Sequence, residues 1–415
     1  MRDVDLVMLL ARSNIRERNM FMKLSANGRF AIHAFDDTRV PEEFDETVTV
    51  DYVASLFNRL IRETRSSPGS ARDHSIYTGA LGIALVAFAF FKCERDLVKQ
   101  IIDDCQPDDR LVTFLDGSTG CYAVKCLYRN PPDVLAQIIR KFHLVTSLPA
   151  SDCELLYGRA GYLYSILFVQ KHLLMTRVGG REMELTARQI LQEGRSNGVD
   201  RGILIWSWEG KEYLGAIHGV AGILFVLLHV EFVQRSPEIM AEITRTVEYV
   251  LEHHRLPSGN IASATESSSD ELVQFCHGAT GWIPLLCKLS SLVSNEKDRY
   301  LSISVELGEI VWKRGLLVTK GPGICHGVAG SVCALVDVYR ATHDKRWLFR
   351  AMQFCIYLRV NLNELLMNAD NPLSLFEGDV GALYAMALVR ALVEGREDSV
   401  FKLMGSSCFP GLGMI

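Results

Sequence analysis

The amino-acid sequence predicts an all-α protein: an α/α toroid, a double-layered barrel of seven inner and seven outer helices. Three observations lead to this prediction. A Gly-X-X-Gly step recurs seven times along the chain, at intervals of roughly forty to sixty residues. An apolar segment follows each step, and an amphipathic segment with helical periodicity lies between successive steps. Sustained alternation of apolar and polar residues, which would indicate strands, is absent from the sequence.

Each glycine step predicts a turn that leads into a buried helix. Apolar runs such as 223–228 follow the steps, and a helix that is apolar on all sides has to be buried. Glycine permits tight turns and close approach of the backbone, so all seven steps are expected at one rim of an inner ring. The steps are Gly79-Gly82, Gly117-Gly120, Gly158-Gly161, Gly219-Gly222, Gly278-Gly281, Gly327-Gly330 and Gly378-Gly381.

The amphipathic segments predict a second layer of helices that covers the first, because a helix with one apolar stripe packs that stripe on a core. They are expected at 51–64, 94–105, 133–145, 183–194, 239–254, 298–313 and 345–360. Alternation of the two types seven times favours a closed ring. We therefore expect a lead-in at 1–50, one barrel domain at 51–400 and a C-terminal tail at 401–415.

Composition excludes several classes of function. The 415 residues are 48% hydrophobic and 22% charged with a net charge of −5, and basic residues form no stripe, so nucleic acid is not expected as a partner. The apolar runs are too short or too interrupted for a transmembrane segment. Eleven cysteines without a recognisable secretory signal predict reduced thiols and a cytoplasmic protein.

Two Cys-His pairs stand at the same position of the repeat. Cys276-His277 and Cys325-His326 both immediately precede the first glycine of their step. Thiolate and imidazole ligands suit Zn²⁺, and three protein ligands with one open position are typical of catalytic zinc. Cys276 and Cys325 with one of the two histidines would form such a site, whereas the other cysteines are expected to be buried as small apolar residues.

Two further residues are candidates for proton transfer. His218 occupies the matching position of the preceding repeat, without a cysteine, so it is either structural or a general acid or base. Glu154 lies four residues before Gly158, where it could orient such a histidine or be an exposed carboxylate.

Four motifs resemble those of the eukaryotic LanC-like proteins, relatives of the bacterial lanthionine cyclases. They are Leu155 to Gly161, Cys276 to Gly281, Lys320 to Gly327 and Ser374 to Gly378, and the resemblance spans roughly residues 27–393. It implies a seven-fold double α-barrel with zinc held by two cysteines and a histidine, here Cys276, Cys325 and His326. It also implies binding of glutathione and its transfer to dehydroamino acids in peptides or proteins.

The resemblance assigns further residues. It places Lys320 on glutathione and makes His218 the proton-transfer group. A glutathione-contacting segment that usually begins with arginine is here Met367-Asn368-Ala369-Asp370, and loss of that arginine would remove a carboxylate partner. Arg29 is the counterpart of an N-terminal arginine that contacts the site.

We therefore expect a zinc-dependent, glutathione-binding transferase, with a non-catalytic zinc- and glutathione-binding adaptor in signalling or redox response as the alternative. A protein prenyltransferase would also use an α/α barrel and a zinc-activated thiol, but its metal site would need an aspartate ligand. A membrane receptor is disfavoured by the length of the apolar runs.

Overall fold

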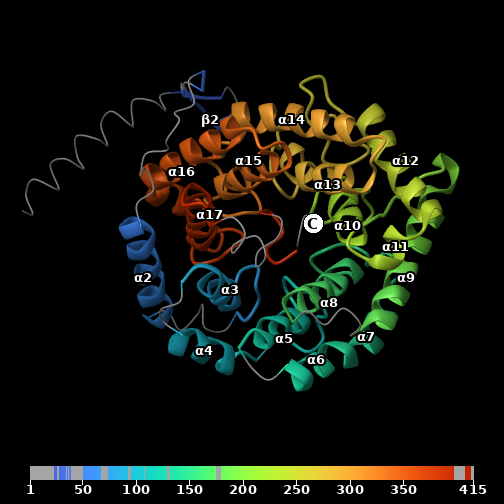
Figure 1. Cartoon of the computed structure of the whole chain (residues 1–415), viewed down its shortest axis with the longest axis horizontal. Coiled ribbons are helices and arrows are strands. Elements are labelled where there is room, and N and C mark those ends of the chain that lie inside the picture. Colours follow the sequence, from blue (N-terminus) through green and yellow to red (C-terminus); the bar gives the residue numbers. More distant parts are fainter. Residues whose placement is uncertain are drawn as a thin grey trace, which may run out of the picture.

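The computed structural model describes residues 23–25, 28–33, 35, 37–38, 50–66, 73–91, 95–106, 108–128, 131–173, 179–396 and 407–412. Within these ranges the chain alternates between an outer and an inner helix and forms two concentric rings (Figure 1). This arrangement confirms the predicted α/α toroid.

The inner ring has seven helices in the described part of the chain, and each begins directly after the first glycine of a Gly-X-X-Gly step. They are α3 (Ala80–Phe90), α5 (Ser118–Cys126), α8 (Arg159–Leu173), α10 (Val220–Leu227), α13 (Ala279–Leu292), α15 (Val328–Thr342) and α17 (Asp379–Val393). Every residue of α10 is buried, as expected for a helix that is apolar on all sides. Even so, none of the described helices combines the length and apolar character needed to cross a bilayer.

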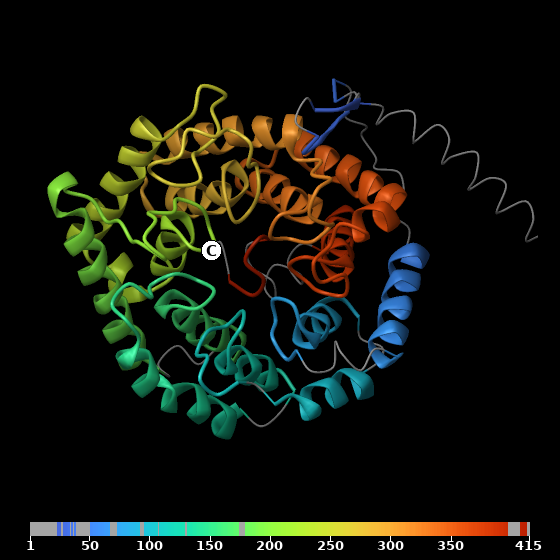
Figure 2. The same ribbon diagram turned by 180° about the vertical axis from the view of Figure 1, so that it is seen from behind.

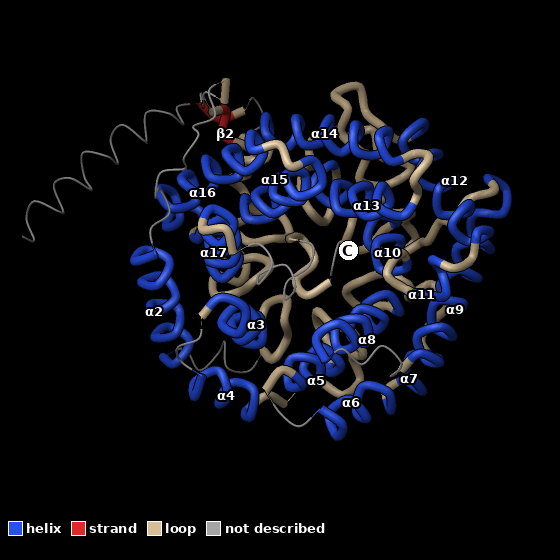
Figure 3. Tube along the Cα trace, viewed as in Figure 1, coloured by secondary structure: helices blue, strands red, loops and turns tan. Residues whose placement is uncertain are grey.

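The outer ring consists of helices that surround the inner ring (Figure 3), and these amphipathic helices pack one apolar stripe inward. In α12 the buried residues include Ile239, Ile243, Val247 and Val250, spaced three or four apart. The main outer helices are α2 (Val50–Ser66), α4 (Arg95–Asp104), α6 (Pro131–Arg140), α9 (Gly180–Gly198), α12 (Pro237–His253), α14 (Lys297–Arg314) and α16 (Lys345–Leu366). All seven overlap the expected segments. The segment expected at 133–145 is divided between α6 and the short helix α7 (Phe142–Ser147), and the short helices η2 (Val199–Arg201) and α11 (Glu231–Gln234) were not expected.

The second glycine of each step lies where the chain folds back on itself. A Cβ at Gly222 would lie 1.7 Å from the carbonyl oxygen of Ala216, and one at Gly120 would lie 1.8 Å from that of Phe114. The same contact, with the carbonyl six residues earlier, lies within 2.7 Å at all seven second glycines. Only glycine permits this approach, which is why the step recurs.

Backbone hydrogen bonds join the loops of neighbouring repeats at the glycine rim. The amide of Tyr77 donates to the carbonyl of Leu115 at 2.9 Å, and that of Cys276 donates to the carbonyl of Cys325 at 3.1 Å. The amide of Phe376 donates to the carbonyl of Tyr77 at 3.1 Å, which joins the last repeat to the first. Figure 2 shows the ring from the opposite face, with connecting loops lying over the inner helices.

Residues near both ends of the chain pack on the barrel. The strands β1 (Lys23–Leu24) and β2 (Ala31–Ile32) form an antiparallel hairpin, too short for the sequence pattern to predict. Near the C-terminus, residues 407–412 lie toward the middle of the ring (Figure 1), where the hydroxyl of Tyr164 donates to the carbonyl of Pro410 at 2.8 Å. Phe409 stacks there on Phe225, with 4.0 Å between ring centroids. The expected domain boundaries at 50 and 400 remain predictions.

Candidate metal centre

Cys276, Cys325 and His326 come together at the glycine rim. The loops that precede α13 and α15 carry them, and the two sulfur atoms and a ring nitrogen of His326 all lie within 4.8 Å of one another. Cys276 is 8% exposed and Cys325 is 2% exposed. The backbone hydrogen bond between the two cysteines holds the loops in register, so the two repeats deliver their side chains to one place.

The donor set fits a metal cation. Burial raises the pKa of the Cys325 thiol, and its hydrogen bond with Cys276 raises it further. The Nε2 atom of His326 is buried and has no hydrogen-bond partner among the described residues. A ring nitrogen that is buried without a partner is costly, and a cation bound between it and the two thiols would satisfy it. Sulfur and nitrogen donors in this number favour Zn²⁺.

His277 lies near this cluster but does not belong to it. The group of potential ligand atoms that includes both thiols contains His326 and not His277. Burial, followed by the charges of His218 and His326, lowers the pKa of His277 to about 4. Of the two histidines that the cysteine pattern left open, His326 is therefore the one whose ring nitrogen lies within 4.8 Å of both sulfur atoms.

Tyr77 contacts the candidate ligands and was missed in the sequence. Its hydroxyl is hydrogen-bonded to the Cys325 thiol, and its ring stacks on Phe376 with 4.9 Å between centroids. Burial raises the pKa of Tyr77 far above its usual range, and the nearby thiols of Cys325 and Cys276 act in the same direction. Tyr77 stands two residues before its glycine, the repeat position that Cys276 and Cys325 occupy, so the register contained the signal.

His218, which is partly buried, pairs with the buried Glu154. The Nδ1 atom of His218 lies 2.9 Å from Oε2 of Glu154, which is 1% exposed, so Glu154 is not the surface carboxylate that the sequence left open. The same oxygen accepts the amide of Leu156 at 2.8 Å. Trp208 stacks flat on the imidazole, with 4.0 Å between centroids. A carboxylate only accepts, so Nδ1 carries a proton and Nε2 is left for other partners.

The His218 pair and the metal cluster belong to neighbouring parts of the rim. Tyr213 lies between His218 and His277, since its ring centroid is 6.1 Å from that of His218 and 5.4 Å from that of His277. His218, His277 and His326 thus stand at one repeat position in three consecutive repeats. The arrangement places the imidazole of His218 on the repeat that precedes that of Cys276.

Lys320 and Asp370 lie beside His326. The Nζ atom of Lys320 is 3.4 Å from Oδ2 of Asp370. A carboxylate oxygen of Asp370, a ring nitrogen of His326 and a carboxylate oxygen of Glu377 form a second group of potential ligands, again within 4.8 Å of one another. The structure therefore brings Lys320 and Asp370 to the cluster of Cys276, Cys325 and His326.

The other residues of the 367–370 segment, Met367, Asn368 and Ala369, differ in their contacts. Met367 is 80% exposed. Asn368 donates from Nδ2 to the carbonyl of Val318 at 2.9 Å. Ala369 packs against Gly321, and a Cβ added to Gly321 would lie 2.8 Å from the Cβ of Ala369. The segment thus holds the loop that carries Lys320.

Arg29 lies on the same side of the barrel. Its guanidinium is 2.8 Å from a carboxylate oxygen of Glu271, and its carbonyl accepts the amide of Val318 at 3.1 Å. The hairpin residues therefore run along the stretch that leads to Lys320. Arg29 is therefore ion-paired with Glu271.

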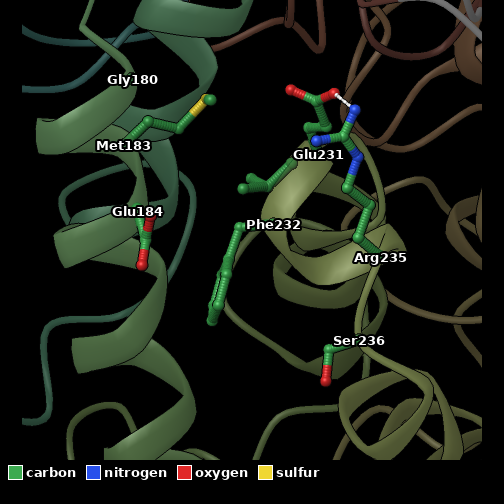
Figure 4. Close-up of a pocket in the computed structure, with 8 residues that line it drawn as sticks. Gly180, Met183, Glu184, Glu231, Phe232, Arg235 and Ser236 are labelled. Atoms are coloured by element: carbon green, nitrogen blue, oxygen red, sulfur yellow. Dashed lines mark ion pairs between the residues drawn. The ribbon is translucent and has the colours of Figure 1, made fainter.

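A pocket of about 390 Å³ lies elsewhere, between α9 and α11 in the outer layer (Figure 4). Its lining combines apolar side chains with ion-paired ones, such as Arg235 with Glu231. The lining residues are Gly180, Met183, Glu184, Val230, Glu231, Phe232, Arg235 and Ser236. No cysteine or histidine is among them, so this pocket lacks the sulfur and imidazole donors that the glycine rim brings together.

Comparisons with known proteins agree with this architecture. Glutathione S-transferase LANCL1 of Danio rerio is 30% identical over 367 residues, which cover 82% of this chain and 89% of that protein. LanC-like protein GCL1 of Arabidopsis thaliana is 32% identical over 345 residues, covering 76% and 78%. The solved structure of nisin cyclase matches with a TM-score of 0.64 at 16% identity, over 85% of this chain and 97% of that one, which shows a shared fold.

The family model described as lanthionine synthetase C-like protein matches residues 70–401. This range contains six of the seven outer helices and all seven inner ones, together with the two Cys-His pairs. The chain therefore belongs to the lanthionine synthetase C-like family.

Proposed function

We propose that this protein is a zinc-dependent thiol transferase that adds a thiol, with glutathione as the first candidate, to dehydroamino acids in peptides or proteins. The observation that carries the proposal is the cluster of Cys276, Cys325 and His326, whose ligand atoms lie within 4.8 Å of one another. Three ligands leave a fourth position open, which is typical of catalytic zinc.

These three residues would hold the metal, and Tyr77 would support them. Zinc bound there would lower the pKa of a substrate thiol, so that the thiolate is available near neutral pH. The hydroxyl of Tyr77, hydrogen-bonded to Cys325, would orient that ligand and offset part of the negative charge on its sulfur. Burial of the cluster keeps these interactions strong by excluding water.

His218 is suited to supply a proton to the product. In the addition, the thiol loses its proton and its sulfur forms a bond to the β-carbon of the dehydroamino acid. The π bond between the α- and β-carbons breaks, and the α-carbon gains a proton. Glu154 holds Nδ1 of His218, so the proton passes through Nε2. No electrons leave the system, so no oxidant is required.

The choice of thiol rests on two points. One similar protein is named a glutathione S-transferase, and Lys320 stands beside His326, where it could contact a substrate carboxylate. The ten cysteines in the described part of the chain are free and buried, which favours a reducing compartment, and we place the protein in the cytoplasm.

A turnover assay tests the proposal. Zinc-loaded protein is incubated with glutathione and a peptide that contains dehydroalanine, and mass spectrometry should detect the peptide–glutathione adduct above the uncatalysed rate. Adduct formation at the uncatalysed rate, by protein that binds zinc and glutathione, would instead favour the non-catalytic adaptor.

A further inference from the structure

Trp208 covers one face of the His218 ring. The two ring planes are 3° from parallel, and their centroids are 4.0 Å apart. Glu154 holds the Nδ1 edge of the same imidazole at 2.9 Å. The carboxylate thus fixes the direction of one ring atom and the indole fixes the plane of the ring, which together determine where Nε2 points.

A tight turn holds Trp208 in this place. Its amide donates to the carbonyl of Lys211 at 2.9 Å, and the amide of Lys211 donates to the carbonyl of Trp208 at 3.1 Å. The two residues between them, Glu209 and Gly210, have φ angles of 48° and 76°, as in a type I′ hairpin. Glutamate seldom adopts a positive φ, and such strain persists where the surrounding structure imposes it, often at functional sites.

The chain that follows this turn is anchored to the neighbouring loop. The carbonyl of Glu212 accepts the amide of Thr265 at 3.0 Å, and its carboxylate accepts the hydroxyl of Thr265 at 2.9 Å. A guanidinium nitrogen of Arg201 donates to the same carboxylate at 2.8 Å. The amide of Leu214 donates to the carbonyl of Ser263 at 3.0 Å. These bonds fix the loop that carries Trp208 relative to the rim.

The flat stack suits a charged imidazole. Two uncharged aromatic rings prefer an offset or edge-to-face contact to a face-to-face one. A cation, in contrast, is attracted to the face of an aromatic ring, and to indole more than to the rings of tyrosine or phenylalanine. A carboxylate at the ring edge favours the same charged form. Trp208 and Glu154 therefore both favour the imidazolium, which is the form that can donate a proton.

The imidazole stays accessible despite these contacts. The side chain of His218 is 17% exposed, whereas that of Glu154 is 1% exposed. Tyr157 and Tyr213 flank the ring at longer distances, with centroids 6.3 Å and 6.1 Å from that of His218. Trp208 is the nearest of these three aromatic rings and covers one face, so the rest of the imidazole can meet a substrate.

We infer that Trp208 is a positioning residue for proton transfer: its indole fixes the plane of the His218 ring, so that Nε2 keeps one direction in which to deliver a proton to the α-carbon of the acceptor. The inference rests on the proposed function, since it concerns the step assigned there to His218. Trp208 acts through His218 and does not exchange a proton itself, because indole is only a hydrogen-bond donor.

Steady-state turnover of zinc-loaded protein with glutathione and the dehydroalanine peptide tests the inference. Trp208→Leu should lower kcat about tenfold, the effect of one partly buried cation–π contact, and leave zinc content and the KM for glutathione unchanged. Trp208→Phe keeps an aromatic face and should recover most of the loss. A change confined to the KM for the peptide would mean that Trp208 binds the acceptor instead, and the inference would be wrong.

Two further variants show whether Trp208 acts through His218. In a His218→Ala background, Trp208→Leu should cause no further fall in the residual kcat. Phe232→Leu is the matched control, because Phe232 is also partly buried but lines the outer-layer pocket, and it should leave kcat as it is. A tenfold loss from Trp208→Leu in both backgrounds, or an equal loss in Phe232→Leu, would overturn the inference.

NMR of protein labelled with ¹³C in its histidine rings measures the stack without turnover. An indole face shields nearby protons, so the His218 ring protons, assigned with His218→Ala, should lie upfield of those of the exposed His143. Trp208→Leu should move them toward the His143 position. Unchanged signals would refute the inference whatever the turnover.

The two measurements separate this inference from the proposed function. If no adduct forms but the His218 signals move in Trp208→Leu, the transferase proposal fails and the orientation of His218 by Trp208 stands. If adducts form and Trp208→Leu keeps the wild-type kcat, the transferase stands and the inference about Trp208 fails.

Discussion

Two parts of the glycine rim share a backbone and differ in chemistry. At the two positions before the first glycine, the fifth and sixth repeats carry Cys276-His277 and Cys325-His326. The second repeat carries Leu115 and Asp116 at the same two positions. Its second glycine, Gly120, contacts the carbonyl six residues earlier, just as Gly281 and Gly330 do.

This difference shows that one set of residues determines the backbone path at the rim and another determines which functional groups each repeat presents there. Glycines and backbone hydrogen bonds set the loop path in every repeat, and two side-chain positions then decide what a repeat contributes. Leu115, 1% exposed, gives its repeat an apolar contact where Cys276 and Cys325 give a sulfur donor. The variants below test this separation, from the largest expected effect to the smallest.

Removal of one sulfur donor should abolish the metal site. Cys325→Ala leaves two ligands. Loss of a residue that is only hydrogen-bonded to a ligand already lowers metal affinity by about 10- to 100-fold, so loss of a ligand should lower zinc affinity by more than about a hundredfold. Elemental analysis after dialysis against a competing chelator measures the remaining zinc. Cys333→Ala is the control, since Cys333 is buried in α15 outside the cluster. Full zinc content in Cys325→Ala would refute the assignment.

The second glycine should matter for folding in a repeat without any metal ligand. Gly222→Ala puts a Cβ 1.7 Å from the Ala216 carbonyl, so we expect a loss of about 3 kcal/mol or more in the free energy of unfolding. At Gly180, in the first turn of α9, a Cβ meets nothing within 4 Å. Gly180→Ala should therefore stabilise by about 0.5 kcal/mol. Urea denaturation measures both, and similar values for the two variants would contradict the argument.

The buried carboxylate beside His218 should affect turnover and not metal binding. Glu154→Gln replaces an acceptor of the Nδ1 proton by an amide, so the imidazole is less well oriented, and kcat should fall about a hundredfold. Zinc content and the KM for the thiol should stay the same, because Glu154 is not among the cluster residues. A parallel loss of zinc would mean that Glu154 acts only by maintaining the fold.

Tyr77 tests whether the first repeat contributes to the same site. Tyr77→Phe keeps the ring stacked on Phe376 and removes the hydroxyl that is hydrogen-bonded to Cys325. Zinc affinity should fall about tenfold, as for other partners of metal ligands. Competition with a zinc indicator measures it. An unchanged affinity would restrict the site to the fifth and sixth repeats.

The sequence predicted what depends on local pattern. The outer helices follow from the spacing of apolar residues, as in Ile239 to Val250, and the inner helices follow from the glycine steps. Tyr77 occupies the matching register position, but its phenol falls outside a pattern defined by thiols and imidazoles, so the sequence did not predict it. The ion pair of Lys320 with Asp370 joins residues fifty apart, and no periodicity encodes which charges meet across two loops.

The smallest expected effect concerns Asp116, which occupies the repeat position of His326 in the second repeat. Burial, followed by the charges of Asp73, Asp108 and Glu154, raises the pKa of Asp116 to about 6. The folded protein therefore binds a proton more tightly at Asp116 than the unfolded chain, whose carboxyl titrates near 4. Between about pH 4 and pH 6 the contribution of Asp116 to the free energy of unfolding falls as pH rises. Above about pH 6 the carboxyl is ionised in the folded protein, and the loss of stability is complete.

Asp116→Asn removes that penalty. The variant should be more stable than wild type at pH 8, by about 1 kcal/mol after allowance for solvent screening of a partly exposed group. The advantage should shrink at pH 5, where the wild-type carboxyl is mostly protonated. Urea denaturation of zinc-loaded protein at both pH values measures the difference. If the variant's gain in free energy of unfolding were equal at pH 5 and pH 8, ionisation of Asp116 would not be costly in the folded protein. The repeat position would then tolerate a charge in the second repeat as readily as it holds an imidazole in the sixth.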